Sequence, residues 1–230
     1  MQGPLSGTFN YTKTEGAFLL GGTGQYEVLV PQTRDIWIGH DGSGRLRTTF
    51  GSPIFFGEHD RAEWQDPPEW LQERTRDETS LRDFSYIDVS DLPTDPDALL
   101  EHILSGLDPS DFGVGPAPWE VFIAAHGILW ETVPPPELSM AVMAMLSENP
   151  DIEVEGGDVD LGGRTATRFS ITSPDGQFRS VMWLDPETGA LLGEQQELLT
   201  ATSTIDAAPP VVIKKATYLV SEVVNSTNDR

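Results

Sequence analysis

Strand-like and helix-like patterns divide the chain into three consecutive parts. Up to residue 56 the residues are β-branched, aromatic and glycine-rich, and they predict an antiparallel meander. The turn Asp41-Gly42-Ser43-Gly44 joins two of its strands, because glycine adopts a positive φ without strain. The predicted strands are Gly7–Thr14, Gln25–Pro31, Asp35–His40 and Arg45–Phe50.

After residue 150 the chain returns to strand patterns. The clearest of these is a hairpin at Phe178–Leu199, in which Pro186 presets φ for a turn that Asp185 begins and Gly189 closes. Apolar residues fall on both faces of its first strand, so we expect a sheet covered on both sides. The other predicted strands are Ile152–Glu155, Arg164–Thr172 and Val211–Val224.

Between these parts, apolar spacing of three and four residues predicts helices at 94–106, 117–132 and 136–148. Thr94 is the predicted N-cap of the first helix, and Pro134-Pro135-Pro136 separates the second from the third. Two stretches lack periodicity and are interpreted as surface excursions, 57–93 and Thr200–Pro210. A helical turn within Trp70–Arg82 is one interpretation of the first excursion.

The order of strands, helices and strands predicts an α+β fold. We expect a strongly curved antiparallel sheet, a half-barrel of roughly eight or more strands, with three helices packed on its concave face. The chain is long enough to bury one core, so we expect a single domain. Its parts are an N-terminal β-meander at 1–56, a surface excursion at 57–93, a helical insert at 94–149 and a C-terminal β-meander at 150–230.

Composition narrows the classes of partner. The chain has 37 Asp and Glu residues against 14 Lys and Arg, a formal net charge of −23. Such a surface repels phosphate, which argues against nucleic acid and against direct binding to anionic membranes. The longest apolar run, Ala117–Trp130, is too short to span a bilayer, and no signal-peptide pattern opens the sequence. We therefore expect any export signal or anchor to lie in a segment outside the printed sequence.

Motifs that would carry catalysis are absent from the sequence. Without cysteine there is no thiol nucleophile or zinc–thiolate site, and no nucleophile elbow, phosphate-binding loop or dinucleotide fingerprint occurs. Three histidines show no metal-binding spacing: His40, His59 and His102. The sequence therefore predicts no catalytic residue, no metal site and no cofactor.

Two kinds of polar residue are interpreted structurally rather than chemically. His126 lies within an apolar helical stripe, and a lone histidine there is usually a hydrogen-bonded core or boundary residue. The acidic pairs Glu153/Glu155 and Glu194/Glu197 are expected on solvated faces, because acids are so frequent in this chain.

The predicted helices carry more aromatic and methionine residues than one core face needs. Met140 and Met143 fall off the apolar stripe of their helix, and such side chains line adaptable apolar pockets. The alternative is a plain core between helices and sheet. If a cavity exists, five residues are expected to line it: Trp119, Phe122, Trp130, Met143 and Trp183.

Three strings resemble a known family: Leu92–Gly106, Ile128–Leu146, and Trp183–Leu198 with Thr217–Thr227. In this order they are similar to the extracytoplasmic domain of a family of actinobacterial single-span membrane proteins, over roughly Trp37 to the C-terminus. No activity is established for that family, so the resemblance implies location and no catalytic residue. The order of elements is more distantly similar to lipoprotein-carrier and periplasmic sigma-regulator domains, in which a curved sheet wraps helices around an apolar cavity.

Together these observations predict a non-enzymatic extracytoplasmic binding or sensing module. Its partner would be an apolar small molecule, a lipid chain or another protein, and its membrane association would depend on a segment outside the printed sequence. An interaction scaffold with no ligand pocket is the alternative, and a hydrolase is a more distant one.

Overall fold

The structure is a computed structural model that describes residues 6–21, 27–58, 61, 73–80, 88–107, 118–156, 161 and 163–228. The chain divides into two compact units. The first, here called the terminal unit, comprises Met1–Tyr86 and Gln195–Arg230; the second, the central unit, comprises Ile87–Glu194. The prediction of a single domain stays a prediction.

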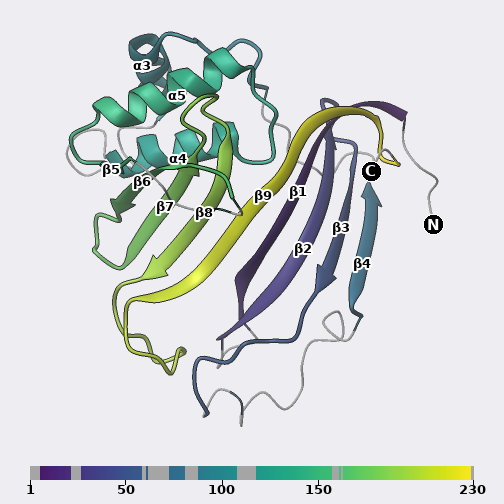
Figure 1. The fold of residues 1–230 in the computed structure, drawn as a ribbon, viewed down its shortest axis with the longest axis vertical. Helices are drawn as coiled ribbons and strands as arrows, with labels where there is room; N and C mark the ends of the chain where they lie inside the picture. Colours follow the sequence, from purple (N-terminus) through teal and green to yellow (C-terminus); the bar gives the residue numbers. More distant parts are fainter. Residues whose placement is uncertain are drawn as a thin grey trace. The chain divides into compact units, whose positions relative to one another are not determined.

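The fold class is α+β, as predicted. In the described residues nine strands form one antiparallel sheet in the order β4-β3-β2-β1-β9-β8-β7-β6-β5, which is not closed (Figure 1). The strands are β1 (Ser6–Gly21), β2 (Glu27–Gly39), β3 (Gly44–Phe50), β4 (Thr75–Ser80), β5 (Glu153–Glu155), β6 (Thr167–Thr172), β7 (Phe178–Leu184), β8 (Leu191–Leu198) and β9 (Val211–Ser226).

Within the terminal unit, β1 pairs with β2 on one side and with β9 on the other. The β2–β3 hairpin matches the prediction, with Ile38 opposite Gly44 and Gly42 at a φ of 77° in the turn. One cluster on this sheet contains Phe9, Tyr11, Trp37 and Val224.

The sequence predicted two separate strands, Gln25–Pro31 and Asp35–His40. This was wrong, because the structure has one continuous strand there, β2. Pro31 lacks an N–H, so it interrupts a strand only where a ladder needs that donor. Its carbonyl accepts from Gly51 N at 2.7 Å, so Pro31 faces the β3 side, where the β2–β3 pairing ends at Gln32 opposite Phe50. The pairing with β1 therefore passes through Pro31, opposite Ala17, without a missing bond.

Strand β4 lies inside the predicted surface excursion, so the helical turn considered for Trp70–Arg82 is wrong over 75–80, and Trp70 itself lies outside the described residues. The strand pairs with β3 on one side and forms an end of the sheet. Most of its residues are exposed, so neither face needs an apolar side chain, and alternation is absent from TRDETS. Charge on an edge strand also hinders pairing with other chains.

The central unit contains α3 (Pro96–Gly106), α4 (Pro118–Leu129) and α5 (Pro136–Glu148), close to the predicted ranges. The N-cap of α3 is Asp95 rather than the predicted Thr94, because the Asp95 carboxylate accepts from Ala98 N at 3.0 Å. The three helices lie together on one side of β5, β6 and β7, with α4 in contact with β6 (Figure 1).

The predicted hairpin of β7 and β8 is present, and its turn lies in the central unit. Asp185 N donates to Ala190 O, and the Asp185 carboxylate accepts from the N–H groups of Glu187 and Thr188. Gly189 has a φ of 70°, and a Cβ there would lie 2.4 Å from the carbonyl oxygen of Ser139. The turn therefore packs directly against the first turn of α5, which only glycine permits.

Both faces of β7 are buried at its C-terminal end, as the sequence indicated. Met182 and Leu184 are fully buried. Val181 and Trp183, which alternate with them, belong to a separate apolar cluster with Leu192 and with Leu161 and Ala166, which precede β6.

Candidate functional site

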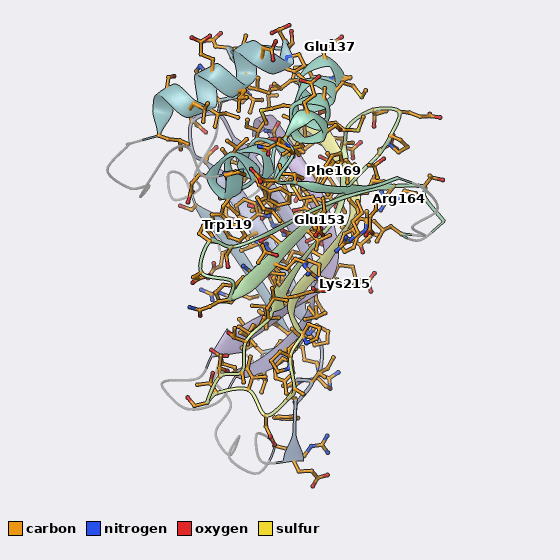
Figure 2. All side chains as sticks on the ribbon, turned by 90° about the vertical axis from the view of Figure 1, so that its left-hand side faces the viewer. Trp119, Glu137, Glu153, Arg164, Phe169 and Lys215 are labelled. Carbon is orange, nitrogen blue, oxygen red and sulfur yellow. The ribbon has the colours of Figure 1, made fainter. Side chains whose placement is uncertain are left out.

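Helix α4 is apolar on two sides. One side supplies buried core residues: Val121, Phe122, Ala125, Ile128 and Leu129. On another side Trp119, Ile123 and Trp130 follow one another at spacings of four and seven, and they keep part of their surface in solvent. Figure 2 labels Trp119 at the start of the helix. We call these three residues the outer stripe of α4.

The outer stripe is unusual for a surface helix. A helix that packs one face on a core normally carries charged residues on the other, but α4 has Glu120 as its only acidic residue and no Lys or Arg. Ile123 is 40% exposed, which places a large branched side chain in water. The helical repeat continues to Trp130, whose N–H donates to His126 O at 2.8 Å. Binding surfaces often contain apolar residues that lie side by side and reach solvent, and this row has both features.

A polar group adjoins the outer stripe. His126 Nε2 lies 2.7 Å from Glu194 Oε2, and the imidazole stacks on the Trp130 ring with centroids 6.1 Å apart. The Glu194 side chain is only 6% exposed, whereas that of His126 is 21% exposed. The interpretation of His126 as a hydrogen-bonded boundary residue is confirmed. The expectation that Glu194 lies on a solvated face is wrong, because the strand β8 turns it toward α4.

The backbone is strained where this helix ends. Glu131 has a φ of 54°, in the left-handed region that residues other than glycine rarely adopt, and it is buried. The next residue, Thr132, donates its hydroxyl to Ile128 O and so satisfies a carbonyl of the last turn. Trp130 therefore lies between the regular helix and the strained residue Glu131.

Trp183 presents a different feature. It is 7% exposed and packs against apolar residues of strands and a loop: Leu161, Ala166, Val181 and Leu192. Its indole Nε1 is buried and has no acceptor in the part of the chain that the structure describes. A buried N–H without an acceptor costs about 1–3 kcal/mol, so buried donors of this kind are rare in folded proteins.

The five predicted lining residues fall into three environments. Phe122 is 1% exposed and belongs to the core, which is what the alternative interpretation expected of it. Trp119, Trp130 and, on α5, Met143 are partly exposed. Trp183 lies in the separate cluster of strand and loop residues. The set of predicted lining residues did not include Ile123, His126 or Glu194. The helical spacing of Ile123 from Trp119 could have indicated Ile123. The contact of Glu194 with His126 spans 68 residues of sequence, so no local pattern could have indicated it.

The terminal unit has a contrasting polar and aromatic face. Arg45 donates twice to the Asp77 carboxylate, at 2.8 and 2.7 Å, and lies over the Trp37 ring at 5.4 Å. The hydrogen bond from Arg45 lowers the pKa of Asp77 below its ordinary value, and the same bond raises the pKa of Arg45. Tyr11 Oη donates to Asp35 at 2.6 Å. These groups satisfy one another, so we interpret this face as structural.

Groups of acidic and histidine side chains that could hold a metal ion are absent from the described residues. Among the helices that the structure describes, none combines the length and the apolar composition that crossing a membrane requires.

Comparison with known proteins adds no family to this picture: no protein-family model matches the chain, and no curated protein matches it either.

Proposed function

We propose that this protein is a non-enzymatic extracytoplasmic binding module that takes an apolar molecule, such as a lipid chain, along the outer stripe of α4. The observation that carries the proposal is the apolar character of α4 on both its buried and its exposed side. The buried side already supplies the helix with a core, so Trp119, Ile123 and Trp130 are not needed to hold it in place. Burying an isoleucine or a similar side chain gains about 1.5–3 kcal/mol, which is available to a ligand here.

A polar group at the Trp130 end of the outer stripe favours an amphipathic ligand. His126 stacks on Trp130 and bonds to Glu194, so a hydroxyl or carbonyl group of a ligand could bond to the imidazole while its chain lies along the helix. The net charge of −23 disfavours an anionic head group. A neutral lipid with an ester or hydroxyl head group fits both conditions.

The location rests on the resemblance to extracytoplasmic domains of single-span membrane proteins described above. Cell fractionation of the natural protein with an epitope tag tests it. Recovery in the cytoplasmic fraction would contradict it.

Native mass spectrometry of the protein purified from cells, followed by solvent extraction, tests for a bound ligand. A co-purifying neutral lipid supports the proposal. If none is found, titration with monopalmitoylglycerol below its aggregation concentration, followed by tryptophan fluorescence, decides: an unchanged spectrum contradicts the proposal.

A pair of variants locates the binding site. Ile123→Ser should weaken monopalmitoylglycerol binding about tenfold, with little change in stability, because this side chain is already partly in water. Leu219→Ser is the matched control, since Leu219 is 45% exposed on β9. Equal effects of the two substitutions would contradict a site on α4.

An interaction scaffold without a ligand is the main rival, because a protein partner could cover the same stripe. It is favoured if Ile123→Ser abolishes a cross-link to a specific protein in cells while no lipid binds. A hydrolase is the distant alternative: His126 is hydrogen-bonded to a carboxylate, but in the described residues it bonds to no hydroxyl group. Turnover of chromogenic esters, peptides or glycosides that is lost in His126→Gln would favour it.

A further inference from the structure

A hollow of about 420 Å³ lies on the terminal unit at the β2–β3 turn. Its lining consists of Gly7, Thr8, Phe9, His40, Asp41 and Ser43. This volume is within the range of small-molecule sites. None of these residues belongs to the outer stripe of α4, so the hollow is independent of the function proposed above.

Gly39 brings the polar groups of the hollow together. A Cβ at this position would lie 2.9 Å from Ser43 Oγ, 3.0 Å from Asp41 Oδ1 and 3.2 Å from the Phe9 ring. Any other residue would therefore force these three groups apart. Two oxygen atoms and an aromatic ring thus converge above one backbone position, and the absence of a side chain there keeps them close.

The turn holds this arrangement in place. Gly39 N donates to Ser43 O at 2.7 Å, and Ser43 N donates to Asp41 Oδ1 at 3.0 Å. The second bond orients the Asp41 carboxylate, while the residue itself remains exposed to solvent. Ser43 Oγ makes no hydrogen bond within the described part of the chain.

The neighbouring end of β1 also lines the hollow. The β1–β2 register begins at Phe9 opposite Gly39, so Gly7 and Thr8 have no partner residue on β2. On the other side, the pairing with β9 is irregular between Ser6 and Phe9. Gly7 and Thr8 both line the hollow, at the point where the regular pairing of β1 ends.

We propose that this hollow binds a small molecule through a primary ammonium group. The carboxylate of Asp41 and the hydroxyl of Ser43 are acceptors that line the hollow, and an ammonium group offers three donors. The Phe9 ring supplies an apolar wall for the attached carbon chain. The net charge of −23 raises the local concentration of cations and favours the same class of ligand.

Amide chemical shifts measured by two-dimensional NMR on the whole chain test this proposal, with putrescine as the probe and 1,4-butanediol as its neutral analogue. Putrescine at millimolar concentration should shift the amides of Gly7, Gly39 and Ser43, and the diol should not. Equal responses to both compounds, or no response to putrescine, would overturn the proposal.

A charge-matched pair of variants separates a site from general attraction to an acidic protein. Asp41→Asn keeps an oxygen for the bond from Ser43 N, so the turn is preserved while the charge is lost. It should weaken putrescine binding about tenfold. Glu148→Gln removes one exposed charge from the central unit and should leave binding unchanged. If both variants lose affinity equally, the attraction is non-specific and the proposal fails.

Discussion

The terminal and central units stabilise their strands in different ways. In the terminal unit, polar and aromatic side chains on one sheet face pair with each other: Arg45 with Asp77 and Trp37, and Tyr11 with Asp35. In the central unit, apolar helices cover the strands, and α4 carries more apolar surface than its core side uses. Polar groups that already pair with each other offer a ligand little binding free energy. Partly exposed apolar groups offer more, because a ligand can remove them from water. This difference is why we assign binding of an apolar molecule to α4.

The largest expected effect concerns the two sides of α4. Phe122→Ala should lower the free energy of unfolding by about 3–5 kcal/mol, since the side chain is fully buried. Trp130→Ala should cost well under that range and should reduce monopalmitoylglycerol binding instead. Urea unfolding followed by circular dichroism measures the first quantity and fluorescence titration the second. A full core cost for Trp130→Ala without any loss of binding would return Trp130 to the core.

Hydrogen exchange on Phe122→Ala also tests whether the two units are energetically separate. Protection should fall for amides of α3, α4 and α5 and stay unchanged in β1 and β2, if each unit opens by itself. A uniform loss of protection would show one cooperative structure and would remove the basis of the comparison.

The next effect concerns the packing of the β7–β8 turn on α5. Gly189→Ala should cost roughly 2–4 kcal/mol, because it combines a positive φ with a Cβ that would overlap the Ser139 carbonyl. Gly176→Ala is the matched control: its φ is also 70°, but nothing lies within 4 Å of the added Cβ. Its cost should be about 1 kcal/mol. Equal midpoints of thermal unfolding for the two variants would contradict the close packing.

Two buried threonines should respond to substitution by valine with smaller changes in the free energy of unfolding, and these two changes should have opposite signs. Thr12 Oγ1, in the terminal unit, is buried and has no partner among the described residues, so Thr12→Val should stabilise the protein by about 1 kcal/mol. Thr132 in the central unit donates to Ile128 O, so Thr132→Val should destabilise it by about 1 kcal/mol. Chemical denaturation of both variants checks this, and a shift of the same sign in both would contradict it.

The smallest effect is electrostatic and depends on pH. The pKa of Asp77 is lowered in the folded protein, so the ion pair with Arg45 contributes stability above the unfolded-state pKa, and this contribution is lost as the pH falls through the folded-state pKa. Because the Asp77 side chain is 38% exposed, Asp77→Asn should cost less than about 1 kcal/mol at neutral pH. The difference from the unsubstituted protein should vanish in acid; a constant difference at all pH values would exclude this cause.

Local patterns in the sequence determined much of the fold. The turns at Asp41–Gly44 and Asp185–Gly189 were predictable because glycine and Asx residues restrict the backbone within a few positions. The three helices were predictable because proline marks their first residues and apolar spacing persists through each one. Information of this kind acts over one turn or one hairpin, so it needs no knowledge of the rest of the molecule.

Only the tertiary structure decided which segments without a local pattern become strands and which side chains are buried. The charged strand β4 has no local strand pattern and exists because β3 offers it an edge, and β2 continues through Pro31 because the missing N–H faces the side where pairing ends. The same holds for the candidate site. Spacing groups Trp119, Phe122 and Trp130 on one helix, but it does not tell which of them meets the sheet and which meets solvent. Burial depends on neighbours far along the chain, as the contact of His126 with Glu194 shows.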